Sequence, residues 1–517
     1  MNPEFQAVDV AYAAVAPMLV VVAGALVGVL VEAFAPRRAR HTIQVALTTT
    51  VLLAAFVVLV VFSRDDLTVT LGGSVVIDGV SLFLQGALLL LSALGVLVMA
   101  ERFGGVGSDA FTPMGASTPG SPQEDVATRI GYATSEVFPL TLFAVLGMMV
   151  FVSANDLITM FVGLEVLSLP LYVMTGLARR RRLLSQEAAL KYFLLGAFSS
   201  AFFIFGAALL YGYAGSSDLK AISTAISTSG GDLEAILLPG IALTLVGLLF
   251  KIGAVPFHSW TPDAYQGAPT PVTGFMAACT KLAAFGAILR LTYVGVGANR
   301  WDWEMGVVVI AALTMVVGAV LSVTQTDVKR LLAYSSIAHA GFILVGVLAF
   351  SQAAIGGVMF YLVAYGFATI AAFGIVAMVR QGGSEASHLS QWAGLGRNHP
   401  VVAGAFSFLL LAFAGIPLTS GFTAKYATFA PAVASGTTGT VLVIIGVLAS
   451  AVTAFVYVRL IVLMYFTDPS GDDDVVALTP SIPSTVAITV GVLVTALAGV
   501  IPGAALELAN SASEFLL

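Results

Sequence analysis

Long apolar runs separated by short polar stretches dominate this chain. A helix of about 20 apolar residues is long enough to cross a lipid bilayer. Fourteen such segments lie near residues 11–34, 43–62, 80–100, 137–153, 156–178, 188–213, 235–258, 272–296, 305–325, 331–350, 353–379, 401–433, 439–466 and 484–507. The pattern predicts an all-α polytopic membrane protein with about fourteen transmembrane helices.

Two of the predicted spans are interrupted. Gly253 and Pro256 break the seventh span, and the twelfth is broken between Gly415 and Gly421, around Pro417. Glycine and proline both disfavour the interior of a regular helix. Broken helices in corresponding positions of two halves are typical of transporters.

The spacing of these features indicates an internal repeat. Pro256 and Pro417 are 161 residues apart, and Asp156 and Asp327, which open the fifth and tenth spans, are 171 residues apart. A unit of five spans is odd, so the second copy must be inverted in the membrane. The predicted division is therefore spans one to three with a long loop (1–135), a first repeat of spans four to eight (136–303), an inverted repeat of spans nine to thirteen (304–466), and an acidic loop with span fourteen (467–517).

Composition agrees with a chain that lies mostly in lipid. Of its 517 residues 59% are hydrophobic and 10% are charged, against about 25% charged in soluble proteins, and the mean hydropathy is +1.00. The net charge of −6 argues against a nucleic-acid partner. Cys279 is the single cysteine, which excludes an internal disulfide and a multi-cysteine metal site.

The loops predict the orientation. Basic residues concentrate in the odd-numbered loops, and only Arg64, Lys220 and Arg300 lie in the even-numbered ones. By the positive-inside rule the odd-numbered loops are cytoplasmic, so both termini are outside. The start of the chain lacks a basic region, so we expect the first span to be retained rather than cleaved as a signal. We expect a flexible cytoplasmic connection at 101–135 and a solvated turn at Asp472–Asp474.

An acidic residue lies deep within a predicted span. Glu165, in FVGLEVLSLPLY, is nine residues into span five. A carboxylate there is costly unless it is paired or protonated, and we expect its partner to be a lysine on span six or seven. The alternative to a functional role is a salt bridge that only fixes helix packing.

Three lysines lie at similar depth. Lys251 directly precedes the break in span seven, where the electronegative carbonyl end of a half-helix would attract an ammonium. Lys425 follows the break in span twelve, where the electropositive start of a half-helix would repel one. Lys281 lies near the middle of span eight. Snorkelling to the lipid headgroups, the usual alternative for membrane lysines, suits none of these depths.

Further titratable residues are candidates for proton relay. Lys191 could take part or could simply pair with Glu187, four residues earlier. His258 could relay protons at the mouth of a pathway or be a hydrogen-bonded loop residue, and His339 could relay protons or fill the core. Packing roles are expected for Tyr361 and Tyr365, whereas Arg290 and Arg459 either hold helices together or reach the lipid headgroups.

Three stretches resemble the antiporter-like membrane subunits of respiratory complex I: FVGLEVLSLPLYVMTG, FKIGAVPFHSWTPDAYQGAPTPVTGFMAACTKLAAF and TDVKRLLAYSSIAHAGF. The resemblance covers spans four to thirteen. It implies fourteen helices with two inverted five-helix units, and a proton-translocating axis formed by Glu165, Lys251, Lys281 and Lys425. Lys425 is a lysine where M-like members have a glutamate, and the lateral helix of L-like members is missing, so the resemblance is to the N-like branch.

The resemblance implies a proton-translocating subunit of a bacterial NADH–quinone oxidoreductase in the plasma membrane. The implied partners are the antiporter-like subunit M and the small subunits K and J, together with the lipid bilayer. NADH, FMN, iron–sulfur clusters and quinone are expected on partner subunits, with no cofactor, metal or redox chemistry in this chain. Two alternatives stay open, a subunit of a multi-subunit sodium/proton antiporter and a structural scaffold with inert charges.

Overall fold

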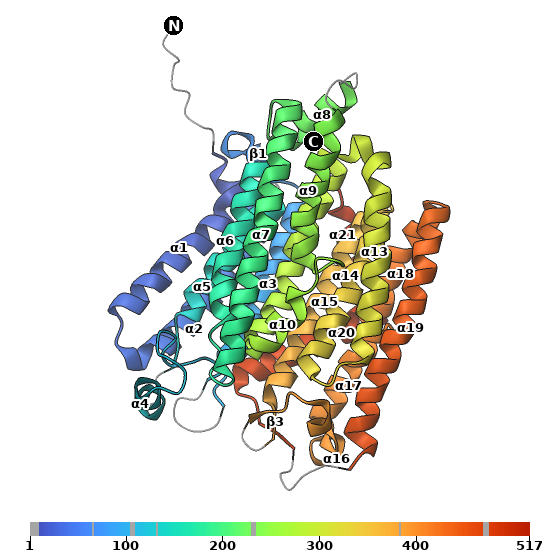
Figure 1. The fold of residues 1–517 in the computed structure, drawn as a ribbon. Helices are drawn as coiled ribbons and strands as arrows, with labels where there is room; N and C mark the ends of the chain where they lie inside the picture. Colours follow the sequence, from blue (N-terminus) through green and yellow to red (C-terminus); the bar gives the residue numbers. More distant parts are fainter. Residues whose placement is uncertain are drawn as a thin grey trace.

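A computed structural model of the chain is a bundle of long helices that run between two ends of the molecule (Figure 1). It describes residues 10–64, 67–103, 109–130, 133–228, 234–381, 384–468 and 475–516. The predicted acidic turn at Asp472–Asp474 lies outside the described residues. In Figure 1, α8 and β1 lie at the upper end, and α4, α16 and β3 lie at the lower end.

The α-helices are α1 (Tyr12–Phe34), α2 (Arg37–Val58), α3 (Gly79–Met99), α4 (Pro122–Ile130), α5 (Val137–Ser153), α6 (Leu157–Thr175), α7 (Arg182–Ala214), α8 (Leu219–Thr228), α9 (Glu234–Ile252), α10 (Trp260–Gly267), α11 (Thr270–Phe275), α12 (Lys281–Arg290), α13 (Arg300–Val323), α14 (Val328–Val347), α15 (Gln352–Met378), α16 (Leu395–Asn398), α17 (Pro400–Ala414), α18 (Ser420–Ala434), α19 (Thr437–Phe466), α20 (Ile482–Val500) and α21 (Gly503–Ser511). Single π-helical turns are η1 (Leu59–Ser63), η3 (Met276–Thr280) and η4 (Leu291–Gly295), and short 3-10 helices are η2 (Leu71–Gly73), η5 (Gly297–Asn299) and η6 (Leu389–Trp392). The strands are β1 (Thr68–Thr70), β2 (Val75–Ile77), β3 (Val379–Gln381), β4 (Ser384–Glu385) and β5 (Val476–Ala477), paired antiparallel in the orders β1-β2 and β4-β3-β5.

Among the described residues, twelve helices are long and apolar enough to cross a membrane. The fourth and twelfth predicted spans correspond to two shorter apolar helices, α5 and α17, so the number fourteen stays a prediction. Both predicted interruptions are confirmed: α9 ends at Ile252 before α10 begins at Trp260, and α17 ends at Ala414 before α18 begins at Ser420.

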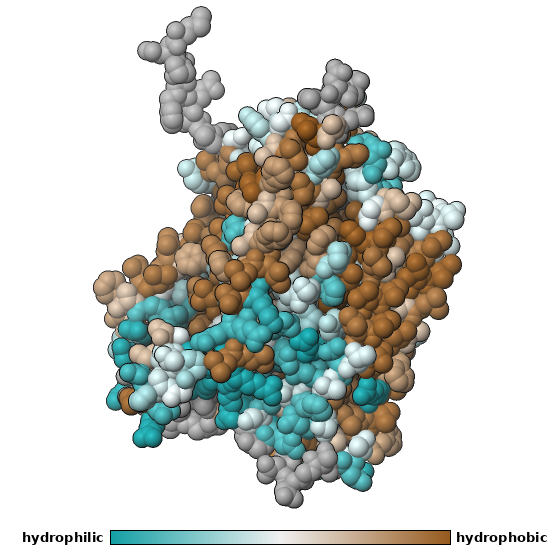
Figure 2. All heavy atoms as spheres, in the orientation of Figure 1, coloured by the Kyte–Doolittle hydropathy of each residue, from teal (hydrophilic) through white to brown (hydrophobic). Residues whose placement is uncertain are grey.

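The helices form a buried centre and an apolar rim. The span from α11 to η4 is almost wholly buried, and α14 and α15 are nearly so, whereas only a third or less of α2, α7 and α20 is buried. Figure 2 shows hydrophobic residues over the sides of the molecule and hydrophilic residues gathered towards the lower end of the visible face. The rim therefore suits lipid or partner helices, and the centre can hold charged groups away from both.

One connection occurs twice, at opposite ends of the molecule. Asp156 caps α6 by accepting hydrogen bonds from its first N–H groups, and pairs in an isolated bridge with Asp218 beside α8. Asp327 caps α14 in the same way and pairs with His388, after β3 and β4. Because α8 lies at the upper end and β3 at the lower end (Figure 1), the two copies have opposite orientations. This supports the predicted inverted repeat.

Where the structure describes it, the predicted loop 101–135 is held against the bundle by ion pairs and a buried aromatic side chain. Arg179 pairs with Asp109 at 2.9 Å, and Arg182 pairs with Glu124 of α4 at 2.8 Å. Phe111 is buried and forms an isolated bridge with Ala178. The expectation of a flexible connection is therefore wrong for residues 109–130, because an aromatic anchor and two acids pair this segment with the start of α7.

A buried ion pair joins the upper ends of two central helices. Asp78, which caps α3, accepts two hydrogen bonds of 2.9 Å from the guanidinium of Arg290 on α12. Both side chains are only 1% exposed. The ring of Phe515 packs against the guanidinium, and the N–H of Leu516 donates to Asp78 at 3.3 Å. The helix-holding role expected of Arg290 is thus confirmed.

We expect Asp78→Asn to destabilise the protein strongly, because it leaves the Arg290 charge buried without a partner. Breaking a buried pair from one side costs about 3–5 kcal/mol. Asp468→Asn is the matched control, since its pair with Arg397 is on the surface with the Asp468 side chain 82% exposed and should contribute under about 1 kcal/mol. Thermal unfolding in detergent checks both variants, and equal midpoints would contradict the expectation.

Candidate functional site

Glu165 lies on α6 and is half-buried in this chain. Its Oε1 accepts a short hydrogen bond from the hydroxyl of Ser200 on α7. Among the described residues, no lysine approaches its carboxylate within 4.0 Å, so its direct partner is a serine, while Lys251 of α9 interacts with it electrostatically from farther away. The reason is geometric, because the lysine of α7, Lys191, lies more than two turns before Ser200 and faces other acids.

Lys251 is buried in the last turn of α9 and is held by hydroxyl groups. Its Nζ donates to Ser168 Oγ at 2.7 Å and to the Tyr192 hydroxyl at 3.3 Å. The rings of Tyr172 and Tyr192 face the ammonium at 5.5 and 5.3 Å. Ser168 lies three residues after Glu165, so one face of α6 carries both the acid and the first partner of Lys251.

Lys281 opens α12 directly after the π-helical turn η3 and is 4% exposed. Its Nζ donates to the Ser336 hydroxyl at 2.5 Å and to the Ser336 carbonyl on α14. The Tyr365 ring lies 5.4 Å from the ammonium, and the hydroxyl of Tyr265 on α10 is 3.3 Å from that of Ser336. An extra residue in a helical turn re-aims the side chains that follow it, which here directs Lys281 towards α14.

The helix α14 links the second and third lysines. Ser336, His339 and Phe342 follow each other at intervals of three residues and so share one face. Ser336 holds Lys281, and the Phe342 ring lies 4.9 Å from the ammonium of Lys425. Between them His339 is 2% exposed, and its Nδ1 is 2.7 Å from the Tyr361 hydroxyl. The His339 Nε2 atom has no partner among the described residues.

Lys425 lies in α18, but its ammonium reaches back across the break to α17. Nζ donates to the carbonyls of Phe413 at 3.2 Å and Ala414 at 2.8 Å, and to Ser450 Oγ at 2.6 Å. These carbonyls end α17, so the ammonium meets an electronegative helix end. The expectation that Lys425 faces a repelling helix start is wrong, because a side chain of this length reaches past its own helix terminus.

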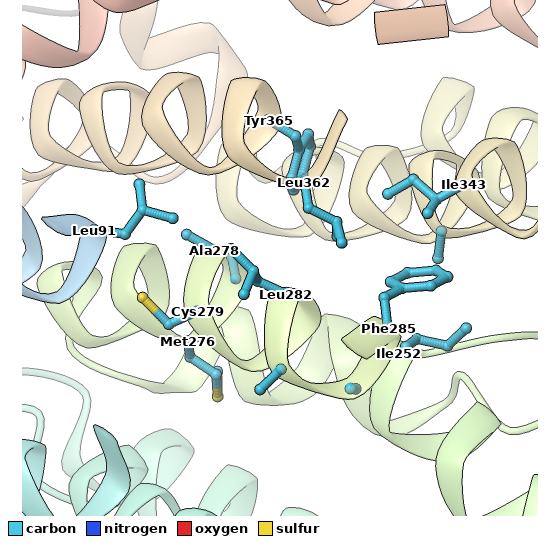
Figure 3. Close-up of a cluster of buried hydrophobic side chains, with 14 of the residues drawn as sticks. Leu91, Ile252, Met276, Ala278, Cys279, Leu282, Phe285, Ile343, Leu362 and Tyr365 are labelled. Carbon is cyan, nitrogen blue, oxygen red and sulfur yellow. The ribbon is translucent and has the colours of Figure 1, made fainter. Parts of the chain in front are cut away.

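Buried apolar side chains pack together on the helices that carry Lys251 and Lys281. Ile252, Leu282, Phe285 and Ile343 belong to a buried cluster that draws on α9, α12 and α14 (Figure 3). Within the described parts of the chain, no hydrogen bond joins the partners of one lysine to those of the next. Each lysine therefore has its own set of polar partners.

The remaining candidates lie outside this row. The Lys191 side chain is 46% exposed and pairs with Glu187 at 2.6 Å and Asp263 at 3.0 Å, so the predicted pair with Glu187 is confirmed. His258 is half-buried after the break in α9, 6.4 Å from the ring of Tyr334 by centroids, and its Nδ1 is buried without a described partner.

Sequence reasoning missed the hydroxyl groups that hold the lysines. These are Ser168, Tyr192, Ser336 and Ser450. Ser168 could have been found from the sequence, because it lies about one helical turn after Glu165. The others are contributed by distant segments, such as Ser336, which is 55 residues from Lys281.

The arrangement suits holding and releasing protons. The three buried ammonium groups have neutral partners, so none is locked into an ion pair at 4.0 Å or less. Within the described ranges, no cluster of three histidine, cysteine, aspartate or glutamate side chains could hold a metal ion.

Comparisons with known proteins identify relatives of this chain. The family model described as NADH:quinone oxidoreductase/Mrp antiporter, TM, matches residues 154–453. The NADH-quinone oxidoreductase subunit N of Rhodococcus opacus (strain B4) is 54% identical, over 98% of this chain and 96% of that protein.

Solved structures share the fold. A chain of respiratory complex I from Thermus thermophilus has a TM-score of 0.76 and 32% identity, covering 96% of this chain and 99% of that chain. A chain of the Mrp complex from Dietzia sp. DQ12-45-1b has a TM-score of 0.79 at 21% identity, covering 96% of each chain, which shows a common fold alone. This chain therefore belongs to the family of NADH:quinone oxidoreductase and Mrp antiporter transmembrane subunits.

Proposed function

We propose that this chain is subunit N of a bacterial NADH–quinone oxidoreductase and that it moves protons across the plasma membrane. The observation that carries the proposal is the set of three buried lysines, Lys251, Lys281 and Lys425, each held by hydroxyls or carbonyls instead of carboxylates. The relative named subunit N, which is similar over nearly the whole chain, supports the same assignment.

In this proposal protons pass along Glu165, Lys251, Lys281 and Lys425, with His339 as a relay between the last two. A unit charge about 10 Å away changes the energy of a proton site by about 1.7 kcal/mol at an effective dielectric constant of 20. Moving one charge through 100 mV involves about 2.3 kcal/mol. The two energies are similar, so protonation of one site can drive release from its neighbour. Lys191 and His258 would relay protons between the aqueous phase and this row.

The chain would act as part of an enzyme whose redox chemistry is elsewhere. NADH, FMN, the iron–sulfur clusters and quinone are assigned to partner subunits, and subunits M, K and J are the proposed membrane neighbours. We further propose fourteen membrane crossings, the division at residues 135, 303 and 466, and both termini outside. The lower end of Figure 1, which carries Arg179–Arg182, would then be cytoplasmic.

A sodium/proton antiporter subunit is the second candidate, favoured by the shared fold of the Mrp chain. Sodium-dependent proton exchange by vesicles that contain this chain but no NADH dehydrogenase subunits would favour it. The scaffold alternative requires inert charges, and full activity of both Lys281→Gln and Lys425→Gln would favour that reading.

We expect Lys251→Ala and Glu165→Ala each to abolish proton pumping while the complex still assembles, because each removes a member of the row. The measurement is the proton-to-electron ratio in vesicles oxidising NADH. Lys220→Ala, an exposed lysine of α8, is the matched control and should pump normally. A normal ratio in either test variant would refute the proposed role.

We expect Gly415→Ala to impair pumping through Lys425. Gly415 has φ +82°, and an added Cβ would lie 3.0 Å from Nζ and Cδ of Lys425. Losing one charged hydrogen bond there should slow transfer about tenfold. Gly215→Ala is the control, because Gly215 has φ +69° with open space around it and so carries the same backbone strain without the clash. Equal pumping rates in the two variants would count against the role of the Lys425 position.

A further inference from the structure

A cavity of about 720 Å³ lies where the connection between α6 and α7 meets the small sheet of β3, β4 and β5. It is at the lower end of the bundle in Figure 1, near β3. The row of buried lysines does not extend into it, since neither Lys251 nor Lys281 lines it. The cavity is therefore separate from the proton-transfer site.

Positive charge exceeds negative charge among the described residues that line this cavity. Five basic residues face two acids, and one basic residue, Arg179, is paired with Asp109 at 2.9 Å. The other four are Arg180, Arg181, Lys329 and Arg380. The one acid that remains is Glu385.

The four cations have mainly neutral partners. Arg180 donates to Ser384 Oγ and Arg181 to Ser387 Oγ, both at 2.6 Å. The guanidinium of Arg380 packs against the ring of Phe103, with its centroid at 4.0 Å. These contacts orient the cations, and Glu385 is the one lining carboxylate left to offset four positive charges.

The buried ammonium of Lys329 is the strongest indication that the cavity is an anion-binding site. Its side chain is 5% exposed, and Nζ donates to the Ala268 carbonyl at 2.7 Å and to Thr270 Oγ1 at 3.1 Å. The nearest carboxylate oxygen, of Glu385, is 4.0 Å away. A buried ammonium is costly without a close counter-ion, and an anion in the cavity would supply one.

We propose that this cavity binds a phosphate group, through Arg180, Arg181 and Lys329. Guanidinium groups match phosphate oxygens with paired hydrogen bonds, and a lysine adds a point charge. Basic pockets between transmembrane helices are a known way to hold anionic lipid headgroups.

A phospholipid headgroup is the favoured source of the phosphate. Phe103, Val476 and Leu478 give the cavity an apolar part that inorganic phosphate would not need. A second groove shares Arg180 and Arg181 and continues to Leu183, which is 74% exposed on α7. A lipid lying along α7 could therefore place its headgroup in the cavity.

The test uses the full-length chain in nanodiscs of phosphatidylglycerol and phosphatidylcholine, with retained lipids counted by native mass spectrometry. The wild type should retain phosphatidylglycerol above its share of the bilayer. In R180Q/R181Q this preference should fall about tenfold, because two charged contacts are lost. Arg459→Gln is the matched control, since Arg459 is an exposed arginine of α19 that donates to the Val323 carbonyl and does not line the cavity.

A second experiment distinguishes a lipid headgroup from a soluble phosphate compound as the ligand. Pyrophosphate is titrated by calorimetry onto the same proteins in nanodiscs of phosphatidylcholine alone. One-to-one binding there, lost in R180Q/R181Q, would identify a soluble phosphate compound as the ligand and support the site. Lys329→Gln should weaken either ligand, and R180Q/R181Q keeps the test valid if Lys329→Gln does not fold. If R180Q/R181Q equals the wild type in both arms, the proposal is wrong.

Discussion

The structure depends on keeping ammonium groups inside an apolar bundle without giving them carboxylate partners. Each of Lys251, Lys281 and Lys425 is compensated by dipoles, either hydroxyl groups or the free carbonyls at a helix end. Dipoles lower the cost of the buried charge without locking it into an ion pair. A carboxylate at 3 Å would instead hold each ammonium in a fixed pair.

Helix interruptions provide these dipoles. The break between α17 and α18 leaves carbonyls that Lys425 reaches, and the π-helical turn η3 sets the direction of Lys281. In an uninterrupted helix most carbonyls are already bonded within the helix, although the Ser336 carbonyl of α14 still accepts from Lys281. The irregular backbone is therefore tolerated in the centre of the bundle because it faces charged groups instead of lipid.

The sequence was enough to predict the features that are local or periodic. Apolar segment length placed most helices, and Gly253, Pro256 and Gly415 marked the breaks correctly. The partners of the lysines were not predictable in the same way, because Ser336 and Ser450 come from other helices and look like ordinary polar residues of a span. The dipole argument for Lys425 failed since it treated the side chain as if it stayed beside its own backbone. The loop 109–130 was misjudged because its composition hid the pairing of Asp109 and Glu124 with arginines.

The hydrogen bonds from Arg180 to Ser384 and from Arg181 to Ser387 join segments about 200 residues apart. One segment connects α6 to α7 and the other follows β3, so these hydrogen bonds join two distant parts of the chain at the lower end of the bundle. Hydroxyl contacts at a wet surface exchange readily with water, whereas apolar packing does not. Any movement of one segment relative to the other would therefore break these two hydrogen bonds first. A ligand bound between the segments would slow that movement.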